Sequence, residues 1–237
     1  MKTIKHTANS RGYANHGWLK SHHSFSFAGY QNPERMNFGV LRVLNDDIVQ
    51  PKMGFGTHPH QNMEIISIPL KGALSHKDSM NNKRAIEVGE VQVMSAGTGL
   101  THSEFNDSKT EEVNFLQLWI IPEEKNVTPN YEQRTFDLKE RENNFQTVVS
   151  PQDKLVNGSL GIHQQASIHI GKFDKDSIVN HAIEVGKGSY VFLLEGELQV
   201  NGELLSKRDA LGVWDTNGVT IKALKDSEIL VVDVPMN

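Results

Sequence analysis

The chain contains no cysteine, which excludes a disulfide framework, a thiolate zinc site and a cysteine nucleophile. Any metal ion must therefore be held by imidazole and oxygen ligands. Long hydrophobic runs are also missing, because apolar stretches such as 115–121 fall far short of the roughly 18 residues of a transmembrane span. The first residues include no apolar segment typical of a secretory signal, so we expect a cytoplasmic protein.

Basic residues are not clustered, which argues against a nucleic-acid partner. The 237 residues include 24 Lys and Arg against 29 Asp and Glu, a formal net charge of −5 with neutral histidines. With 37% hydrophobic and 22% charged residues, the chain has a globular composition and can bury a core without covalent staples. We expect neither nucleic acid nor a membrane as a direct partner, and protein partners stay open.

Helical periodicity is scarce, and most segments have the composition of strands. Only 138–144 and the region around Pro122 fit short helices. The Asn-Gly pairs at 157–158, 201–202 and 217–218 mark turns, and the last two predict tight hairpins because both residue types accept a positive φ. Many short strands between turns predict a sandwich or a barrel. The predicted strands are 38–49, 64–68, 90–94, 113–121, 168–173, 191–200 and 228–234.

The sequence also shows signs of an internal repeat. Residues 64–79 and 189–203 each contain an apolar strand, a glycine (Gly72 or Gly196), an alternating strand and a polar turn. Two copies of one β-barrel unit fit the length, joined by the polar stretch 122–144. Because any two hairpins share this rhythm, periodicity alone leaves the repeat open.

Histidine is abundant, and two of its spacings predict a metal site. His58 and His60 point to the same face of an extended segment, about 6.5 Å apart, and Glu64 keeps that face if the strand continues. His102 and Glu104 repeat the spacing. If a strand pair joins the two segments, three imidazoles and one or two carboxylates meet, which suits a divalent cation. A lone His-x-His pair is common on surfaces, whereas two ligand pairs beside glycine-rich turns are more specific.

The remaining histidines have no partner at ligand spacing, and we expect structural roles for them. His22 and His23 alternate with phenylalanines, so one of the two should face a core. The others in this class are His76 on a hairpin strand, His163, His169 and His181.

The motifs HPHQNME and GEVQVMSAGTGLTHSE resemble the two cupin motifs in the form found in the pirin family, closest to its bacterial quercetin 2,3-dioxygenases. The stretch ANHGWLKSHHSFSFAGY and residues 45–47 resemble that family too, so the likeness covers essentially the whole chain. It implies an all-β bicupin of two jelly-roll barrels. The N-terminal barrel at 1–121 would bind the metal, and the C-terminal barrel at 145–237 would follow the connection at 122–144.

The resemblance also implies a ligand set. The general cupin pattern takes its fourth ligand from the first motif, here Glu64. Pirin-like proteins use three histidines and the glutamate two residues after the last one, which gives His58, His60, His102 and Glu104. Glu64 then becomes a nearby carboxylate that orients a ligand imidazole or holds a proton. The family implies one divalent ion, Fe(II), and the same donors also suit Zn, Ni, Cu, Co or Mn.

The second half of the sequence lacks this ligand set. Aligning the two glycines of the repeat puts Ala182 and Glu184 at the places of His58 and His60, and no histidine follows His181. We therefore expect a degenerate C-terminal barrel that packs on the first and closes the mouth of its site. In this view His181 is a relic or a surface residue rather than a ligand.

The first hypothesis for the function is a dioxygenase. A flavonol such as quercetin would bind through its 3-hydroxyl group, and Glu104 or Glu64 would accept the proton. Reaction with dioxygen would open the central ring and release carbon monoxide and a depside. Phe55, Met63 and Met94 flank the ligand segments as candidate pocket walls, although an ordinary barrel core would use the same residues.

Two alternatives belong to other classes. The protein could be a metal-binding regulator that acts through protein partners, with incidental flavonol activity, as the likeness to eukaryotic pirins implies. It could also run another cupin reaction, such as isomerisation or decarboxylation of a small acid. That reaction needs a cation for the substrate carboxylate, for which Arg42 is the candidate.

Overall fold

The computed structural model describes residues 1–156 and 158–236, and this part of the chain forms 22 strands and three short 3-10 helices. Its longest helix has four residues, so the predicted all-β class is confirmed. No described helix has the length and apolar character that crossing a membrane requires. Asn157, part of one expected turn, lies outside the described residues. The helices are η1 (Ala8–Ser10), η2 (Leu138–Arg141) and η3 (Gln152–Lys154).

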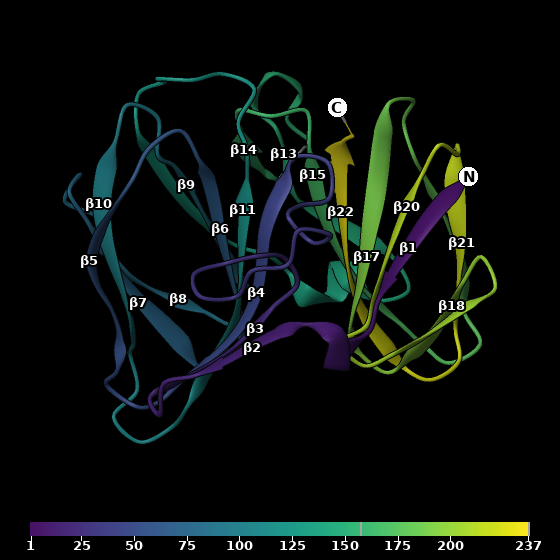
Figure 1. Ribbon diagram of the computed structural model, residues 1–237, viewed down its shortest axis with the longest axis horizontal. Helices are drawn as coiled ribbons and strands as arrows, with labels where there is room; N and C mark the ends of the chain where they lie inside the picture. Colours follow the sequence, from purple (N-terminus) through teal and green to yellow (C-terminus); the bar gives the residue numbers. More distant parts are fainter. Residues whose placement is uncertain (157, 237) are drawn as a thin grey trace.

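The first barrel consists of a seven-stranded and a four-stranded sheet (Figure 1). The large sheet has the order β12-β9-β6-β11-β4-β3-β2 and the small one β5-β10-β7-β8. The bounds in the large sheet are β2 (Gly12–Asn15), β3 (Leu19–His23), β4 (Leu41–Val49), β6 (Glu64–Lys71), β9 (Glu90–Ser95), β11 (Val113–Ile120) and β12 (Asn130–Thr135). Those in the small sheet are β5 (Gly54–His60), β7 (Ala73–Asp78), β8 (Lys83–Glu87) and β10 (Leu100–Asn106).

The second barrel has the same two sheet sizes. Its large sheet has the order β1-β20-β17-β22-β15-β13-β14 and its small sheet β16-β21-β18-β19. The large sheet contains β1 (Lys2–His6), β13 (Phe145–Pro151), β14 (Leu160–Ile162), β15 (Ser167–Phe173), β17 (Lys187–Glu195), β20 (Ala210–Trp214) and β22 (Ser227–Pro235). The small sheet contains β16 (Ile178–Ala182), β18 (Glu197–Val200), β19 (Glu203–Ser206) and β21 (Gly218–Ala223).

The two barrels repeat one arrangement of strands, which confirms the bicupin architecture. The order β9-β6-β11-β4 corresponds to β20-β17-β22-β15, and β5-β10-β7-β8 corresponds to β16-β21-β18-β19. In both copies the chain passes from the large sheet to the small one at a glycine with positive φ, Gly72 at 76° and Gly196 at 98°. A Cβ atom on Gly196 would lie 2.4 Å from the carbonyl oxygen of Asp226, so this crossing requires glycine.

Two strands cross the segment limits predicted from the sequence. β1 pairs with β20 in register Lys2↔Trp214 to His6↔Ala210, so the first residues complete the large sheet of the second barrel. β12 lies inside the expected connection 122–144 and pairs with β9 of the first barrel. Each barrel therefore contains one strand from outside the segment that the sequence assigned to it.

The predicted hairpin turns and short helices are only partly present in the described structure. Asn201 and Gly202 have φ of 47° and 91° and close the β18–β19 hairpin as predicted. The pair 217–218 forms no hairpin, because the flanking strands β20 and β21 lie in different sheets. The helix expected at 138–144 is reduced to the short η2, and the described residues around Pro122 form no helix.

The two large sheets lie in the centre of the molecule, and the small sheets lie on the outside (Figure 1). The largest apolar cluster lies between the barrels and combines Leu44 and Ile66 of the first with Ile170 and Leu230 of the second. Burial of this area holds the two barrels together. The interior of the first barrel contains only smaller apolar clusters, which leaves room for polar side chains.

Candidate metal centre

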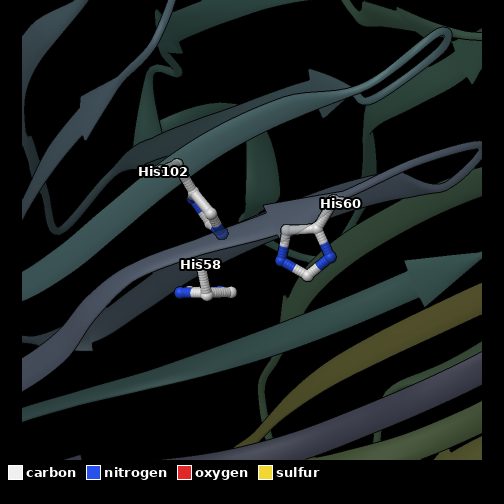
Figure 2. Close-up of side chains that lie close together, drawn as sticks. All are labelled: His58, His60 and His102. Atoms are coloured by element: carbon white, nitrogen blue, oxygen red, sulfur yellow. The ribbon is translucent and has the colours of Figure 1, made fainter.

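Strands β5 and β10 bring three imidazoles together inside the first barrel (Figure 2). His58 and His60 share a face of β5, and His102 lies opposite His58 in the register of the strand pair. The ring centroids are 4.5 Å apart for His58 and His102, 4.8 Å for His58 and His60, and 4.9 Å for His60 and His102. The strand pairing predicted from the two motifs is thus present.

The nitrogen atoms of this cluster fit a cation. Within the described part of the chain, Nε2 of His60 and both ring nitrogens of His102 are buried without a hydrogen-bond partner. Nδ1 of His58 lies 2.8 Å from the carbonyl oxygen of Gly56, which can only accept a hydrogen bond, so Nε2 keeps a free lone pair. Burial is the main cause that lowers the pKa of His60 to about 4 and that of His102 to about 2. The imidazoles of His60 and His102 are therefore neutral, as ligation requires.

Glu104 lies on the same strand as His102 and is fully buried. Its Oε1 accepts a hydrogen bond from Ser67 at 3.0 Å, and its Oε2 accepts one from Gln117 at 2.6 Å. Burial raises the pKa of this carboxyl group, although a nearby histidine and these two hydrogen bonds act in the opposite direction. Its ligand atoms form a second close group with His102 and His76, the residue across from it on β7.

His76 is a member of the site that spacing did not reveal. Its Nε2 lies 3.2 Å from Asp78 Oδ2, and its ring centroid is 5.4 Å from that of His102. The residue reaches the site through cross-strand pairing of β7 with β10, and a search along the sequence does not detect such pairing. One sequence signal could have found His76. It is a histidine on a strand of alternating polarity that neighbours a predicted metal motif.

Glu64 does not lie with this cluster. A turn at 61–63 separates β5 from β6, so the continuous strand expected from His60 onward is interrupted. Glu64 accepts a hydrogen bond from Ser95 at 2.6 Å and lies beside His163 of the second barrel, on the face of β6 that packs against that barrel. The expectation that Glu64 shares the face of His60 is therefore wrong.

A cavity of about 650 Å³ opens beside the imidazole cluster, with His58 and Glu104 in its wall. Phe55 lines it as predicted and packs edge-on against Trp18, with ring centroids 5.4 Å apart. Met63 and Met94 do not line the cavity, because both pack in a neighbouring apolar cluster. Most of the wall comes from β2, β3 and the segments beside them, and it contains six aromatic side chains. The aromatic wall consists of Tyr13, Trp18, Phe27, Tyr30, Phe55 and Trp119.

One part of the cavity wall is polar. His23 Nδ1 lies 2.9 Å from Asn45 Oδ1, and the Ser21 hydroxyl group donates to Asp47. Burial raises the pKa of Asp47 to about 7, and the charges of Asp46 and Glu104 act in the same direction. A substrate in this cavity would thus meet aromatic walls and a carboxyl group that titrates near neutral pH.

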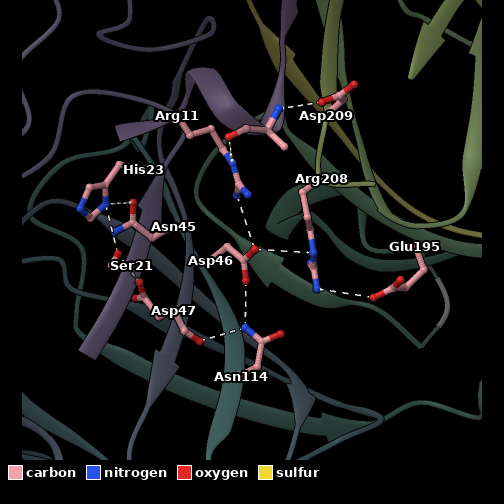
Figure 3. Close-up of polar contacts among 11 residues, drawn as sticks. Arg11, Ser21, His23, Asn45, Asp46, Asp47, Asn114, Glu195, Arg208 and Asp209 are labelled. Carbon is pink, nitrogen blue, oxygen red and sulfur yellow. Dashed lines mark hydrogen bonds and ion pairs between the residues drawn. The ribbon is translucent and has the colours of Figure 1, made fainter. Parts of the chain in front are cut away.

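A polar network connects this wall with the second barrel (Figure 3). Asp46, the neighbour of Asp47 on β4, lies 3.5 Å from Arg11 Nη1 and 3.6 Å from Arg208 Nε. Asn114 donates to Asp46 Oδ1 at 2.8 Å and to the carbonyl oxygen of Asp47 at 3.0 Å. Of these two adjacent carboxyl groups on β4, Asp46 therefore belongs to the contact between the barrels and Asp47 to the cavity wall.

Arg42 cannot serve as the cation that a carboxylate substrate would need. Its Nη1 donates to the carbonyl oxygens of Ser26 and Met36, at 2.7 Å and 3.1 Å. It is not among the residues that line the cavity beside the imidazole cluster. The hypothesis of isomerisation or decarboxylation of a small acid thereby loses its candidate residue.

The second barrel contains a polar cluster that the sequence did not predict. His169, His181 and Asp233 lie together on β15, β16 and β22. The view of His181 as a surface residue is wrong, because only 10% of its side chain is exposed and it contacts Asp233 at 2.9 Å.

Two cupin-type barrels with a histidine cluster in one of them define a bicupin with a candidate metal centre. A family model for pirin matches residues 5–120, and one for the quercetinase C-terminal cupin domain matches residues 147–234. The quercetin 2,3-dioxygenase of Escherichia coli strain K12 is 45% identical over 228 residues, which cover 96% of each chain. The chain belongs to the pirin family.

Solved structures agree with this assignment. The crystal structure of YhhW from Escherichia coli matches with a TM-score of 0.95 at 44% identity and covers 100% of this chain and 99% of that one. A structure of the bacterial pirin YhhW in complex with nickel(II), also from Escherichia coli, matches with a TM-score of 0.94 at 43% identity and covers 100% of both chains. A relative of this fold therefore binds a divalent transition metal.

Proposed function

We propose that the protein is a metal-dependent dioxygenase that opens the central ring of a flavonol such as quercetin. The observation that carries the proposal is the cluster of three imidazoles, with buried ring nitrogens of His60 and His102 that lack a hydrogen-bond partner, beside a cavity of about 650 Å³ with aromatic side chains in its wall. A cavity of this size lies within the range of small-molecule sites. The 45% identity to a quercetin 2,3-dioxygenase over nearly the whole chain supports the same reaction.

The proposed ligands are His58, His60, His102 and Glu104. His102 belongs both to the group of three imidazoles and to the group that contains Glu104, so it connects the two. Imidazole and carboxylate ligands suit Fe(II), which we propose as the working ion, and they equally admit the nickel that a relative binds. The bound ion would supply the redox chemistry that makes dioxygen react with the substrate.

The protein residues position the substrate and receive its proton. Trp18, Phe55 and Trp119 provide flat apolar faces for a planar ring system. Glu104 lies in the cavity wall, so we assign it as the acceptor of the 3-hydroxyl proton, in place of Glu64, which faces the other barrel. The overall change consumes one dioxygen and releases one carbon monoxide and a depside.

The test is reconstitution with Fe(II) under anaerobic conditions, followed by addition of quercetin and then dioxygen. We expect stoichiometric uptake of dioxygen, with a loss of at least about 100-fold in His58→Ala and Glu104→Ala. His163→Gln is the matched control, because this histidine lies 3.6 Å from a carboxylate, Glu124, outside the candidate site. Full metal occupancy without turnover, with Fe(II), Ni(II), Mn(II) or Co(II), would overturn the proposal and favour a regulator that acts through protein partners. A cytoplasmic location remains a prediction.

A further inference from the structure

The polar cluster of the second barrel, His169, His181 and Asp233, converges on one carboxylate. His181 Nε2 lies 2.9 Å and 3.1 Å from the two carboxylate oxygens of Asp233, and His169 Nε2 lies 3.2 Å from Oδ2. The two imidazole centroids are 5.3 Å apart. Three side chains from three strands thus direct their potential ligand atoms to one point.

The surroundings hold these three side chains in place. Thr147 Oγ1 lies 3.0 Å from His169 Nδ1, and the Ser189 hydroxyl group donates to Asp233 Oδ1. The ring of Phe145 packs edge-on against His181, with centroids 5.4 Å apart. A hydroxyl group on the far nitrogen of an imidazole fixes the ring orientation, as the outer partners of metal ligands do.

We propose that His169, His181 and Asp233 form a second divalent-metal site, of the type that takes Zn(II), Co(II), Ni(II) or Fe(II). Nothing in this inference depends on the reaction proposed for the first barrel.

The geometry matches that of ligands around one ion. Ligand atoms that each lie about 2.1 Å from a metal at neighbouring octahedral positions are about 3.0 Å apart. The separations between Asp233 and the two imidazoles are 2.9–3.2 Å, and the three ligand atoms all lie within 4.8 Å of one another. Two histidines and one carboxylate leave open positions for water or a small ligand. The side chains are 10–15% exposed, so an ion can reach them from solvent.

The competing explanation is a hydrogen-bonded cluster without a metal. In that case both Nε2 atoms carry protons and donate them to Asp233, and Thr147 donates to Nδ1 of His169. With a metal, the tautomer of His169 is reversed and its Nδ1–H donates to Thr147, since a hydroxyl group serves in either role. Both arrangements satisfy the same contacts, so a direct measurement of metal binding decides between them.

The position of the cluster explains why spacing did not reveal it. Ser189 and Asp233 face each other across β17 and β22. The corresponding strands of the first barrel, β6 and β11, carry the pair Ser67 and Gln117, which holds Glu104. Asp233 is thus a proposed ligand on the strand that corresponds to the one carrying Gln117, which only supports a ligand. The residues of the proposed site are spread over more than 60 positions of the sequence, from 169 to 233.

The test counts metal ions in the full chain. Equilibrium dialysis against Co(II), with elemental analysis and visible absorption, should give two ions per chain in the unaltered protein. The double variant His58→Ala/His102→Ala, which lacks first-barrel ligands, should keep one. Adding Asp233→Asn or His169→Gln to this background should weaken the remaining binding at least about 100-fold, whereas His163→Gln should leave it unchanged.

Two results would overturn the second site. One is a double variant that binds no Co(II) at concentrations that fill the unaltered protein. The other is a double variant whose Co(II) binding survives Asp233→Asn. Thermal unfolding of each variant shows that it is folded. If the double variant does not fold, the single variant Asp233→Asn decides, because a second site predicts a fall from two ions per chain to one. A constant ratio contradicts it. Loss of turnover plays no part in this test, so the proposed dioxygenase reaction can fail or hold independently.

Discussion

The two barrels share one strand order and differ in what fills them. The interior of the first contains a cavity of about 650 Å³ together with the imidazole cluster and buried carboxyl groups. The interior of the second is packed with apolar side chains, beside which lies the polar cluster around Asp233. Its apolar filling consists of Phe173, Ile183, Val191, Leu193, Leu198, Val200, Leu205, Leu211, Val213, Val219, Ile221, Ala223, Ile229 and Val231. The same strand arrangement can therefore hold either a candidate functional site or an apolar core, depending on its inward-facing residues.

The largest effect on stability should come from a substitution in the apolar interior of the second barrel, compared with the same substitution at the cavity wall of the first. Leu198→Ala empties a fully buried position of the second barrel and should lower the free energy of unfolding by roughly 3 kcal/mol. Leu19→Ala removes the same atoms at the cavity wall and should cost about 1 kcal/mol, because the vacated space joins an existing cavity. Urea unfolding measures both. Equal losses would contradict the contrast between the two interiors.

An intermediate effect should come from the contact between the barrels. Asp46→Asn leaves the buried guanidinium group of Arg11 without its counter-ion and should cost about 2 kcal/mol. The control is Asp215→Asn, which breaks an exposed ion pair with Lys2 and should cost less than about 1 kcal/mol. Thermal unfolding should show a lower midpoint for Asp46→Asn only. A similar shift of the midpoint in both variants would contradict the claim that the polar network around Asp46 stabilises the contact between the barrels.

The smallest effect concerns pH. Burial raises the pKa of Asp47 to about 7, so the folded protein keeps a proton that the unfolded chain releases above about pH 4. This carboxyl group therefore lowers stability progressively as pH rises from about 4 to 7. Asp47→Asn should remove that loss, which amounts to about 1 kcal/mol at pH 6 relative to pH 5. Urea unfolding at both pH values tests it, and parallel pH dependences of the two proteins would disprove it.

The sequence predicted the features that depend on spacing along one strand. His58 and His60 share a face because of the i, i+2 rule, and the register of β5 with β10 then places His102 opposite. The all-β class followed from strand composition, whereas strand rhythm left the repeat open and the family resemblance implied it. Local chemistry and short-range geometry were sufficient for the shared histidine face and the all-β class.

The features that depend on pairing between distant strands escaped prediction. His76 reaches the site across β7 and β10, and Asp233 meets two histidines from other strands. Glu64 was misplaced because the chain leaves β5 after His60 and enters β6, a strand of the other sheet, at Glu64. In each case the deciding information is the sheet register, which single-strand periodicity does not contain.

The place of β1 determines whether the two barrels can be separated. Residues 2–6 form the edge of the second barrel's large sheet and cover β20, about 200 residues further along the chain. A fragment cut at residue 145 would expose β20 as a bare edge, a known template for self-association. During synthesis residues 2–6 cannot form this pairing until the chain has been made as far as residue 214. The duplicated unit seen in the topology is therefore not a continuous segment of the sequence, because the large sheet of the second barrel takes its edge strand from residues 2–6.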